Sequence, residues 1–150
     1  MRPEPSRRLF FESLASAEAG ARLRLDKAAR QHARVLRISD GAPIQLFDGQ
    51  GRLADGVLRG DKVVIDEVTT HPPPSPCLGL LQGLPKGAKS DDIVRMATEL
   101  GASDILFVHT RRSIAHTKDP EKKLQRWTRI AHEASRQCER LHFPLIRVLA

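Results

Sequence analysis

Short apolar runs separated by turn residues dominate the first half of the chain. Two turn segments, DGQG (48–51) and RGDK (59–62), interrupt these runs. One helical pattern, DKAARQHARVLR (26–37), lies among them, with Asp26 as its expected N-cap. This arrangement predicts a small β-barrel with one helix. The runs with the length and the β-forming residues of strands are RRLFFES, ARLRL, PIQLFDG, RLADGVLRG and KVVIDEV.

A proline-rich segment, THPPPSP (70–76), marks a boundary in the chain. Consecutive prolines cannot continue a helix or donate to a sheet, so they form an extended spacer. We therefore expect one domain over residues 1–72 and a second over residues 77–150.

The second half alternates apolar runs with longer amphipathic segments. The runs at 78–84, 104–110 and 145–149 are typical of buried parallel strands. A helix is expected from Ser90, as its N-cap, to Gly101, and a longer one from Asp119-Pro120 to about Leu141. This order indicates half of a doubly wound α/β sheet, so the fold class of the whole chain is expected to be α+β.

Apolar positions at helical spacing predict which side of each helix is buried. For the first helix of the second half they are Ile93, Val94, Ala97 and Leu100. For the long helix they are Leu124, Trp127, Ala131, Ala134, Cys138 and Leu141. Cys138 also stands four residues before His142, which could be half of a metal site, but no further ligands lie at a recognisable spacing. We therefore expect Cys138 to be a buried thiol and expect no metal.

The loop GLPKGAKS (83–90) resembles a rearranged phosphate-binding motif. A Walker loop has four residues between its glycines and a lysine directly after the second glycine. Here three residues separate Gly83 from Gly87, and Ala88 precedes the lysine. Nucleotide hydrolysis is therefore excluded, whereas contact of Lys86 and Lys89 with an anion stays open because the loop joins a strand to a helix.

The net charge of +7 favours a polyanionic partner, with nucleic acid preferred over a membrane. A solvated basic surface would have the same composition. No stretch approaches the roughly 18 apolar residues of a transmembrane helix. The two cysteines form no disulfide framework, which favours the cytoplasm.

Four stretches, in order along the chain, resemble one protein family. QGLPKGAKSDDIVRMATELGASDI (82–105) is similar to the segment that opens the catalytic domain of the ribosomal RNA small subunit methyltransferase E family, which belongs to the SPOUT methyltransferases. The other stretches are RLFFES, HARVLRISDGAPIQLFDGQG, and RRSI followed by RWTRIAHEASRQCERLHFP. The resemblance implies a PUA-like RNA-binding barrel over residues 1–72. It implies the first part of a SPOUT domain, Rossmann-like and knotted when complete, over 77–150.

The same resemblance implies a reaction. Such enzymes transfer a methyl group from S-adenosylmethionine to N3 of a uridine in small-subunit (16S-type) ribosomal RNA, as homodimers whose active sites include both subunits. They bind the cofactor in C-terminal glycine-rich loops, and no such loops precede Ala150. We therefore expect a partial version of the enzyme, with unknown cofactor-binding residues and negligible cofactor binding by these 150 residues alone.

The sequence also departs from the family pattern at three positions. Ala88 and Ser90 replace the acidic residue and the methionine that are usual in the loop. Glu139 stands where glycine is common, which could disturb a close approach of backbone or RNA.

Methylation of uridine N3 requires removal of a proton and stabilisation of the resulting anion. Glu133, Gln137 and Arg140 lie at i, i+4 and i+7 on one stripe of the long helix, and Arg112 follows the second strand at its carboxyl end. All four fall within the resemblance and are the candidate catalytic residues.

The two arginines that flank Glu133 along the helix determine its expected role. Arg129 and Arg136 should lower the pKa of the Glu133 carboxyl, which makes it a weak general base. We therefore expect Glu133 to orient an arginine. Arg112 or Arg140 would stabilise the uracil anion, and Gln137 would hydrogen-bond a base edge. Simple surface ion pairs between Glu133 and the arginines are the alternative.

Basic residues in three regions are the candidate RNA contacts, and an ordinary solvated surface is the alternative for each. They are Arg30, Arg34 and Arg37 on the first helix, Lys86 and Lys89 in the loop, Arg111 after the second strand, and Arg126 and Arg129 on the long helix. The alternative function is a non-catalytic RNA-binding module that keeps the barrel and half of the α/β domain.

Overall fold

The computed structural model of the 150-residue chain describes residues 7–110 and 119–149. The chain divides into two compact units, Met1–Pro72 and Pro73–Ala150, and the division falls inside the proline-rich segment. Each unit has its own hydrophobic core. Among the described residues, no helix is both long enough and apolar enough to cross a membrane.

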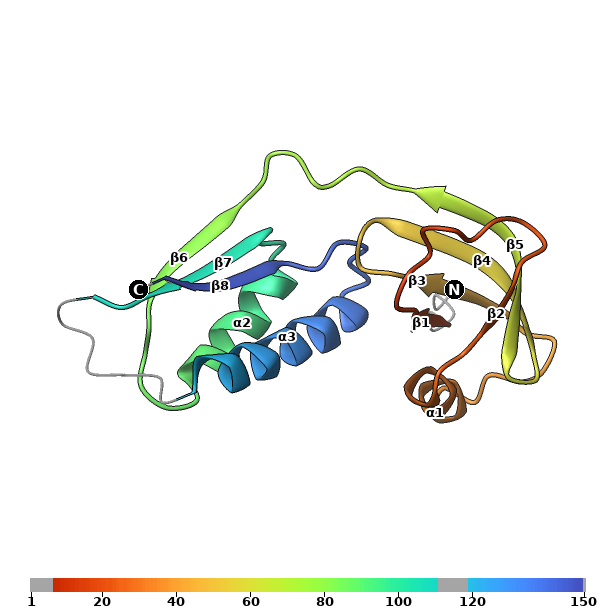
Figure 1. The fold of residues 1–150 in the computed structure, drawn as a ribbon, viewed down its shortest axis with the longest axis horizontal. Coiled ribbons are helices and arrows are strands. Elements are labelled where there is room, and N and C mark those ends of the chain that lie inside the picture. The colour runs from red at the N-terminus through yellow and green to blue at the C-terminus, as the bar shows by residue number, and fades with distance from the viewer. Residues whose placement is uncertain (1–6, 111–118, 150) are drawn as a thin grey trace, which may run out of the picture. The chain divides into compact units, whose positions relative to one another are not determined.

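Unit 1 is a curled five-stranded sheet in the order β1-β3-β4-β5-β2 (Figure 1). The first strand pairs parallel to β3, and every other neighbouring pair is antiparallel. All five runs that were predicted to be strands are therefore confirmed. The strands are β1 (Arg8–Phe10), β2 (Arg22–Arg24), β3 (Pro43–Phe47), β4 (Arg52–Arg59) and β5 (Lys62–Thr70).

A β-bulge between β4 and β5 increases the curl of this sheet. The pairing register shifts between Asp55 and Gly56, which leaves Asp66 as the extra residue on β5. A Cβ atom on Gly56 would lie 2.4 Å from the backbone oxygen of Val64. Only glycine fits at this position without a shift of the neighbouring strand.

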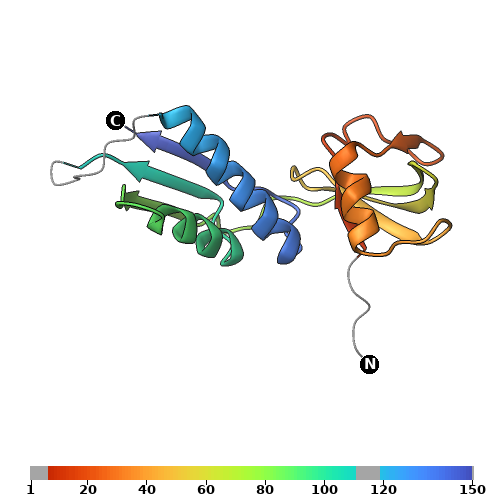
Figure 2. The ribbon, with the colours of Figure 1, turned by 90° about the horizontal axis from the view of Figure 1, so that it is seen from below.

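The helix of unit 1, α1 (Lys27–Val35), packs against the curled sheet (Figure 2). Asp26 is its N-cap, as predicted, because its Oδ1 accepts a hydrogen bond from the backbone N–H of Ala29 at 2.6 Å. The small residues Ala29 and Ala33 are its buried positions. The exposed face of α1 carries arginine side chains.

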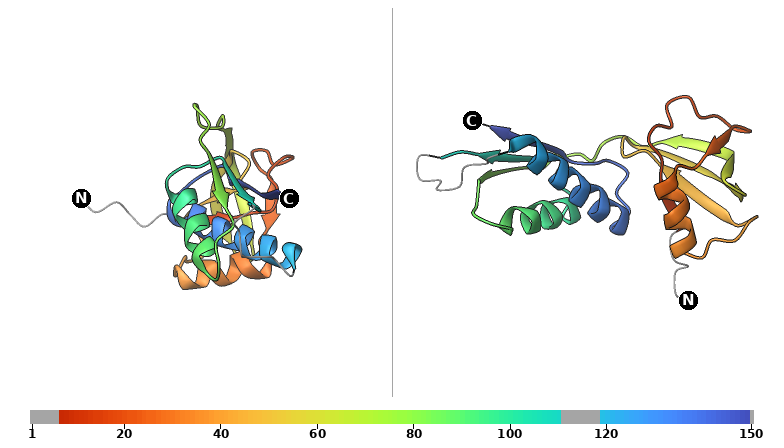
Figure 3. Two further views of the ribbon diagram at one scale, coloured as in Figure 1. Left: turned by 90° about the vertical axis from the view of Figure 1, so that its left-hand side faces the viewer. Right: turned by 60° about the horizontal axis from the view of Figure 1, so that its bottom comes forward.

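Unit 2 is a parallel sheet in the order β6-β7-β8, with β6 (Gly79–Gly83), β7 (Asp104–Val108) and β8 (Leu145–Leu149). Its two helices, α2 (Lys89–Glu99) and α3 (Pro120–Gln137), lie side by side on one face of the sheet (Figure 3). A doubly wound sheet carries helices on both faces, so this unit is one half of such an arrangement. The predicted α+β fold class is confirmed.

The core of unit 2 lies between the sheet and its two helices. Phe107 of β7 stacks on Trp127 of α3 with a distance of 4.3 Å between the ring centroids. Val94 of α2, Ile105 of β7 and Ala131 of α3 complete the centre of this cluster. The long helix begins at Asp119-Pro120, as predicted, and Asp119 caps it by accepting a hydrogen bond from the backbone N–H of Lys122 at 3.0 Å.

The start of α2 differs from the prediction. Its N-cap position is Ala88, which makes no capping hydrogen bond through its side chain, and Ser90 is fully buried in the first turn. The prediction that Ser90 caps the helix is therefore wrong. The left-handed conformation of Gly87, with φ of 68°, turns the chain into the helix before Ser90 is reached.

The ends of both helices of unit 2 also differ from the prediction. The helix α3 stops at Gln137 rather than near Leu141, so that Cys138 is an exposed thiol and not a core residue. Leu141 is only half-buried, and Leu100 at the C-cap of α2 is 81% exposed. These predictions are wrong for one reason: the helical spacing was extended past the residues where the helices end.

Candidate nucleic-acid interface

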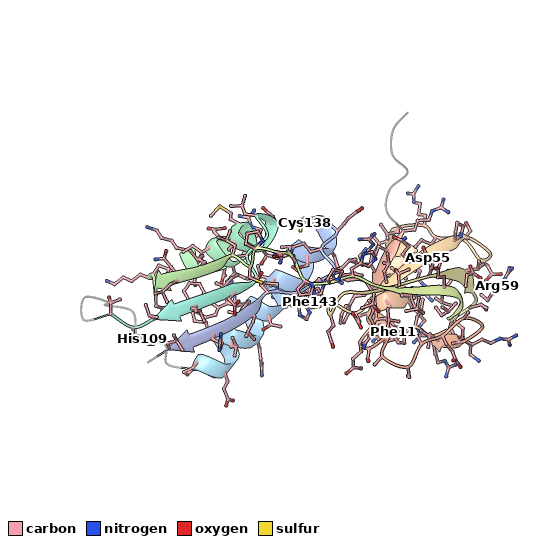
Figure 4. All side chains as sticks on the ribbon, turned by 90° about the horizontal axis from the view of Figure 1, so that it is seen from above. Phe11, Asp55, Arg59, His109, Cys138 and Phe143 are labelled. Carbon is pink, nitrogen blue, oxygen red and sulfur yellow. The ribbon has the colours of Figure 1, made fainter. Side chains whose placement is uncertain are left out.

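Three segments of unit 2 converge at the carboxyl edge of its sheet. The backbone N–H of Leu84 donates to the oxygen of Val108 at 2.9 Å, and that of His109 donates to the oxygen of Leu149 at 3.2 Å. Figure 4 shows His109 just beyond the ends of the strands. Open α/β sheets bind their ligands at this edge.

The N-terminus of α2 stands at the same edge with two exposed lysines. The N-cap residue Ala88 makes no side-chain hydrogen bond to the helix, and in the first turn the backbone N–H of Asp91 donates to the oxygen of Ala88 at 2.9 Å. Lys86 and Lys89 are exposed, and neither has an acidic partner among residues 7–110 and 119–149. The helix dipole and the two ammonium groups together suit a phosphate or another anion.

Two carboxylates in the first turn of α2 would oppose such an anion, but each is paired with an arginine. Asp91 forms an ion pair with Arg126 of α3, and Asp92 forms one with Arg95 at 2.8 Å. The hydrogen bond that Arg95 donates to Asp92 raises the pKa of Arg95. Arg126, a predicted RNA contact, thus ties α3 to α2 and compensates the charge of Asp91.

The predicted stripe on α3 ends at the opposite, amino edge of the sheet. There Nη1 of Arg140 donates to the backbone oxygens of Thr98 at 2.8 Å and of Ala102 at 2.9 Å. Burial lowers the pKa of this guanidinium. Cys138 and Phe143 mark this end of the unit in Figure 4. The geometry of Arg140 is that of a clamp on the C-terminal end of α2.

Glu133 and Gln137 are both exposed on α3. Within the described part of the chain, Glu133 forms no ion pair with Arg129 or Arg136, so the surface pairs considered for it are absent. The neighbouring His132 stacks on Phe143 with 3.8 Å between ring centroids. Burial, and secondarily the charge of Arg136, lower the pKa of His132.

Three of the four candidate catalytic residues, Glu133, Gln137 and Arg140, lie toward the amino edge of the sheet. The eighteen-residue helix α3 spans about 27 Å, from the carboxyl edge of the sheet to the amino edge. Its last turns bring Glu133 close to Gln137 along the helix, and Arg140 follows. Arg111 and Arg112 lie outside the described residues, and they follow Thr110, which stands at the carboxyl edge.

The arginines predicted to contact RNA in unit 1 all belong to one region of its surface. Arg30 and Arg34 are exposed on α1, and Arg37 is exposed just after it. Arg37 has φ of 53°, so it terminates the helix instead of continuing its face. Arg34 has no acidic partner among the described residues, which leaves its guanidinium open to a ligand.

Two residues at the carboxyl edge were missed by the sequence interpretation. His109 and Thr110 directly follow β7, and a Cβ atom on Gly83 would lie 3.6 Å from Cγ2 of Thr110. They therefore stand beside the loop that carries Lys86. The rule that ligands bind beyond the carboxyl ends of parallel strands would have selected them from the predicted strand alone.

A family of RNA methyltransferase domains matches residues 73–150, which is unit 2. Ribosomal RNA small subunit methyltransferase E from Mycobacterium bovis is 33% identical over 119 residues, which covers 75% of this chain and 45% of that protein. The protein of the same name from Synechocystis is 32% identical over 115 residues, with 74% of this chain and 37% of that protein covered. The chain thus spans less than half the length of these relatives.

Solved structures show the same likeness. The small subunit methyltransferase E from Neisseria gonorrhoeae, bound to S-adenosylmethionine, superposes with a TM-score of 0.78 at 25% identity and covers 96% of this chain and 63% of that one. A Legionella pneumophila protein described as a methyltransferase, also with the bound cofactor, has a TM-score of 0.78 at 25% identity and covers 97% and 63%.

Fold and site together define a mixed α+β protein whose parallel half-sheet has a helix N-terminus without a side-chain cap at its carboxyl edge. The chain belongs to the family of RNA methyltransferase domains. The resemblance to the small subunit methyltransferase E family is confirmed by the relatives and by the solved structures.

Proposed function

We propose that this protein methylates N3 of a uridine in small-subunit ribosomal RNA, with S-adenosylmethionine as the methyl donor. The observation that supports this proposal most directly is the uncapped, lysine-flanked N-terminus of α2 at the carboxyl edge, inside the segment that matches the RNA methyltransferase family. This edge is suited to hold the phosphates of an RNA substrate. The names of the relatives support ribosomal RNA as that substrate.

The residues present fit the cofactor in one respect. The uncapped N–H groups of α2 suit a carboxylate, which S-adenosylmethionine carries, as well as they suit a phosphate. When bound, the cofactor supplies the methyl group as an activated sulfonium. The residues of this chain have other tasks: Lys86 and Lys89 hold RNA, Glu133 orients an arginine, and Gln137 bonds a base edge.

The separation of the candidate residues supports a homodimeric enzyme. Glu133 and Gln137 stand toward the amino edge of the sheet, whereas Thr110, which precedes Arg111 and Arg112 in the sequence, stands at the carboxyl edge. A second copy of the chain can bring the amino edge of one subunit to the carboxyl edge of the other. We propose that the uracil anion is stabilised by Arg112 from one copy, with Glu133 and Gln137 from its partner.

The separation of these candidate residues also favours a second candidate function, RNA binding without catalysis. A single chain that never assembles these residues would be an RNA-binding module without catalysis. Its basic helix α1 and its lysine-bearing loop would still contact phosphates.

Methyl transfer distinguishes the two functions. The full-length protein is incubated with small ribosomal subunits that lack the modification and with S-adenosylmethionine labelled in its methyl group. Digestion of the RNA and mass spectrometry of the nucleosides should then reveal labelled 3-methyluridine. A label on another base would contradict the proposed specificity. RNA binding without any transfer would establish the non-catalytic module.

A further inference from the structure

A groove of about 360 Å³ lies in unit 1 between α1 and the turn that joins β4 to β5. The groove exists because α1 packs on the sheet through two small residues, Ala29 and Ala33, whose side chains leave space beside the helix unfilled. The floor of the groove is apolar and consists of Leu25, Ala33, Ile38 and Leu58. A volume at the lower end of the range for ligand pockets suits one nucleoside-sized group.

The rim of this groove is cationic. Arg30 and Arg34 line it from the helix. Arg59 does not line the groove but is the chain neighbour of Leu58 and Gly60, which do, and a Cβ atom on Gly41 would lie 3.2 Å from its Nη1 (Figure 4). Neither Arg34 nor Arg59 has an acidic partner among the described residues. Nε of Arg30 donates to the backbone oxygen of Asp26 at 3.3 Å, which orients its guanidinium without neutralising it.

Two carboxylates also line the groove, and both are already engaged. Asp40 accepts a hydrogen bond from the backbone N–H of Gly60 at 2.6 Å. Asp61 forms an ion pair with Arg24 at 2.7 Å, and the hydrogen bond from Arg24 holds the pKa of Asp61 below its usual value. Their remaining oxygen lone pairs can accept from the exocyclic amine of a base.

A second groove of unit 1 provides a contrast. It has a volume of about 300 Å³ and is lined by Gln45, Asp55 and Asp66 together with Arg7. Gln45 donates to Asp55 at 2.9 Å, so the Asp55 carboxylate is oriented within a polar row of side chains. Two carboxylates against one arginine disfavour a polyanion. The groove beside α1 is therefore the better site for nucleic acid.

We propose that the groove beside α1 binds one unstacked nucleotide of single-stranded RNA. The base lies on the apolar floor over Ala33 and Leu58, and the flanking phosphates contact Arg30 and Arg34. Unpaired nucleotides can insert a base into such a groove, whereas a paired base in an A-form duplex cannot leave its stack without unpairing. This inference rests on the proposed function, because it assumes that RNA is the partner, and it assigns unit 1 a subsite separate from the methyl-transfer site.

The experiment uses the full chain and a ten-nucleotide single-stranded RNA of mixed sequence, with the same strand in a duplex for comparison. Methyl NMR of Ile38 and Leu58 reports on the floor, and fluorescence anisotropy at several salt concentrations reports affinity. The single strand should shift both methyl signals, and the duplex should not. Arg34→Gln should weaken binding several-fold and lower the slope of log K against log salt by about 0.7.

Filling the groove tests the base separately from the phosphates. Ala33→Leu adds an apolar side chain to the floor, so it should weaken binding about tenfold, which corresponds to the loss of one base contact, and leave the salt slope unchanged. Arg22→Gln is the matched control, because Arg22 is exposed on β2 of the same unit and does not line the groove. Arg34→Gln changes only an exposed side chain and should fold even if Ala33→Leu does not.

Several outcomes would overturn the inference. Equal losses for Arg34→Gln and Arg22→Gln would show that only net charge matters, and unshifted floor methyl signals would place the RNA elsewhere. Poly-glutamate that shifts the floor signals as strongly as RNA would indicate an acidic peptide as the ligand. If both groove variants methylate ribosomal RNA with unchanged KM and the NMR signals show no RNA in the groove, the subsite is overturned. The proposed function then remains intact. If RNA binds in the groove but no methyl group is transferred, the proposed function is overturned and the subsite remains.

Discussion

Single residues in left-handed conformation follow each of the three helices in the described part of the chain. Arg37 follows α1 with φ of 53°, Gly101 follows α2 with φ of 94°, and Glu139 follows α3 with φ of 59°. After α3, the backbone N–H of Arg140 returns to the oxygen of Ser135 at 2.9 Å, as in a Schellman motif. The left-handed conformation at position 139 is one that favours glycine, so backbone conformation alone gives a reason for the glycine that the family resemblance leads us to expect there.

Glu139→Gly should stabilise unit 2 by about 1 kcal/mol, because glycine adopts the left-handed region without the cost that a Cβ atom imposes. Urea denaturation followed by the fluorescence of Trp127, the one tryptophan of the chain, measures the change in this unit. Glu139→Ala is the matched control, since it removes the charge and keeps the strained conformation. Equal stability of the two variants would contradict the explanation.

Arg140 is a clamp in this structure, so its removal should affect stability. Arg140→Ala loses two hydrogen bonds to backbone oxygens and should destabilise unit 2 by about 2 kcal/mol. Arg147→Ala, which loses only an exposed ion pair with Asp104 at 3.3 Å, should cost less than about 1 kcal/mol. If Arg140→Ala keeps full stability but loses methyl transfer, the catalytic role predicted from the sequence is the correct one.

His132 should make the stability of unit 2 depend on pH. Burial holds its pKa in the folded state below the ordinary value of 6.5. The unfolded chain therefore binds the proton more readily, so the contribution is complete above about pH 6.5 and is lost as pH falls toward the folded-state pKa. His132→Phe keeps a ring against Phe143 and should lose less stability than the wild type between about pH 7.5 and 5.5. An equal loss of unfolding free energy in the two proteins between these pH values, measured by urea denaturation, would contradict this assignment.

At the scale of elements, we propose that the loop before α2 and the helix itself form one anion-binding unit. The loop supplies Lys86 and Lys89, the helix supplies uncapped N–H groups, and Arg126 and Arg95 compensate its two aspartates. No one of these features is a binding site, since a helix terminus or a lysine is common on any protein surface. Their combination at the carboxyl edge is what favours a phosphate.

Lys86→Ala and Lys89→Ala should each weaken binding of a small-subunit ribosomal RNA fragment and reduce the salt slope by about one unit, because each lysine releases counterions from one phosphate. Arg22→Gln, on the outside of unit 1, serves as the control of equal charge. An unchanged slope in both lysine variants would remove the loop from the interface.

At the scale of the whole molecule, the proposed function depends on the two edges of one small sheet. The helix α3 connects them and separates Glu133 from the residues that follow β7. A shared site between two copies would use both edges at once, whereas one chain alone could use only one of them. Complementation between variants distinguishes these arrangements.

Arg112→Ala and Glu133→Ala should each reduce methyl transfer when assayed alone. In a mixture, a heterodimer of the two variants contains one site in which both residues are intact. The mixture should therefore recover about a quarter of the wild-type activity, if subunits exchange freely. Activity no higher than the mean of the two separate variants would show that Arg112 and Glu133 act within one chain.

The sequence by itself determined the elements, their order and the family. Strand runs, the Asp26 and Asp119 caps and the proline-rich boundary all depend on residues close together in the chain, and such local preferences are readable without coordinates. The family was likewise recognised from four stretches of sequence and their order along the chain, and the match to the family model agrees.

Only the tertiary structure decided how distant residues meet. The parallel pairing of β1 with β3, the placement of α2 and α3 on one face, and the groove beside α1 depend on contacts between segments far apart in sequence. The same holds for Arg140, whose spacing from Glu133 suggested a shared site until its hydrogen bonds placed it on the end of α2. Helical spacing predicts the face on which a side chain lies, but the neighbour that the face meets is determined by packing, which no local pattern encodes.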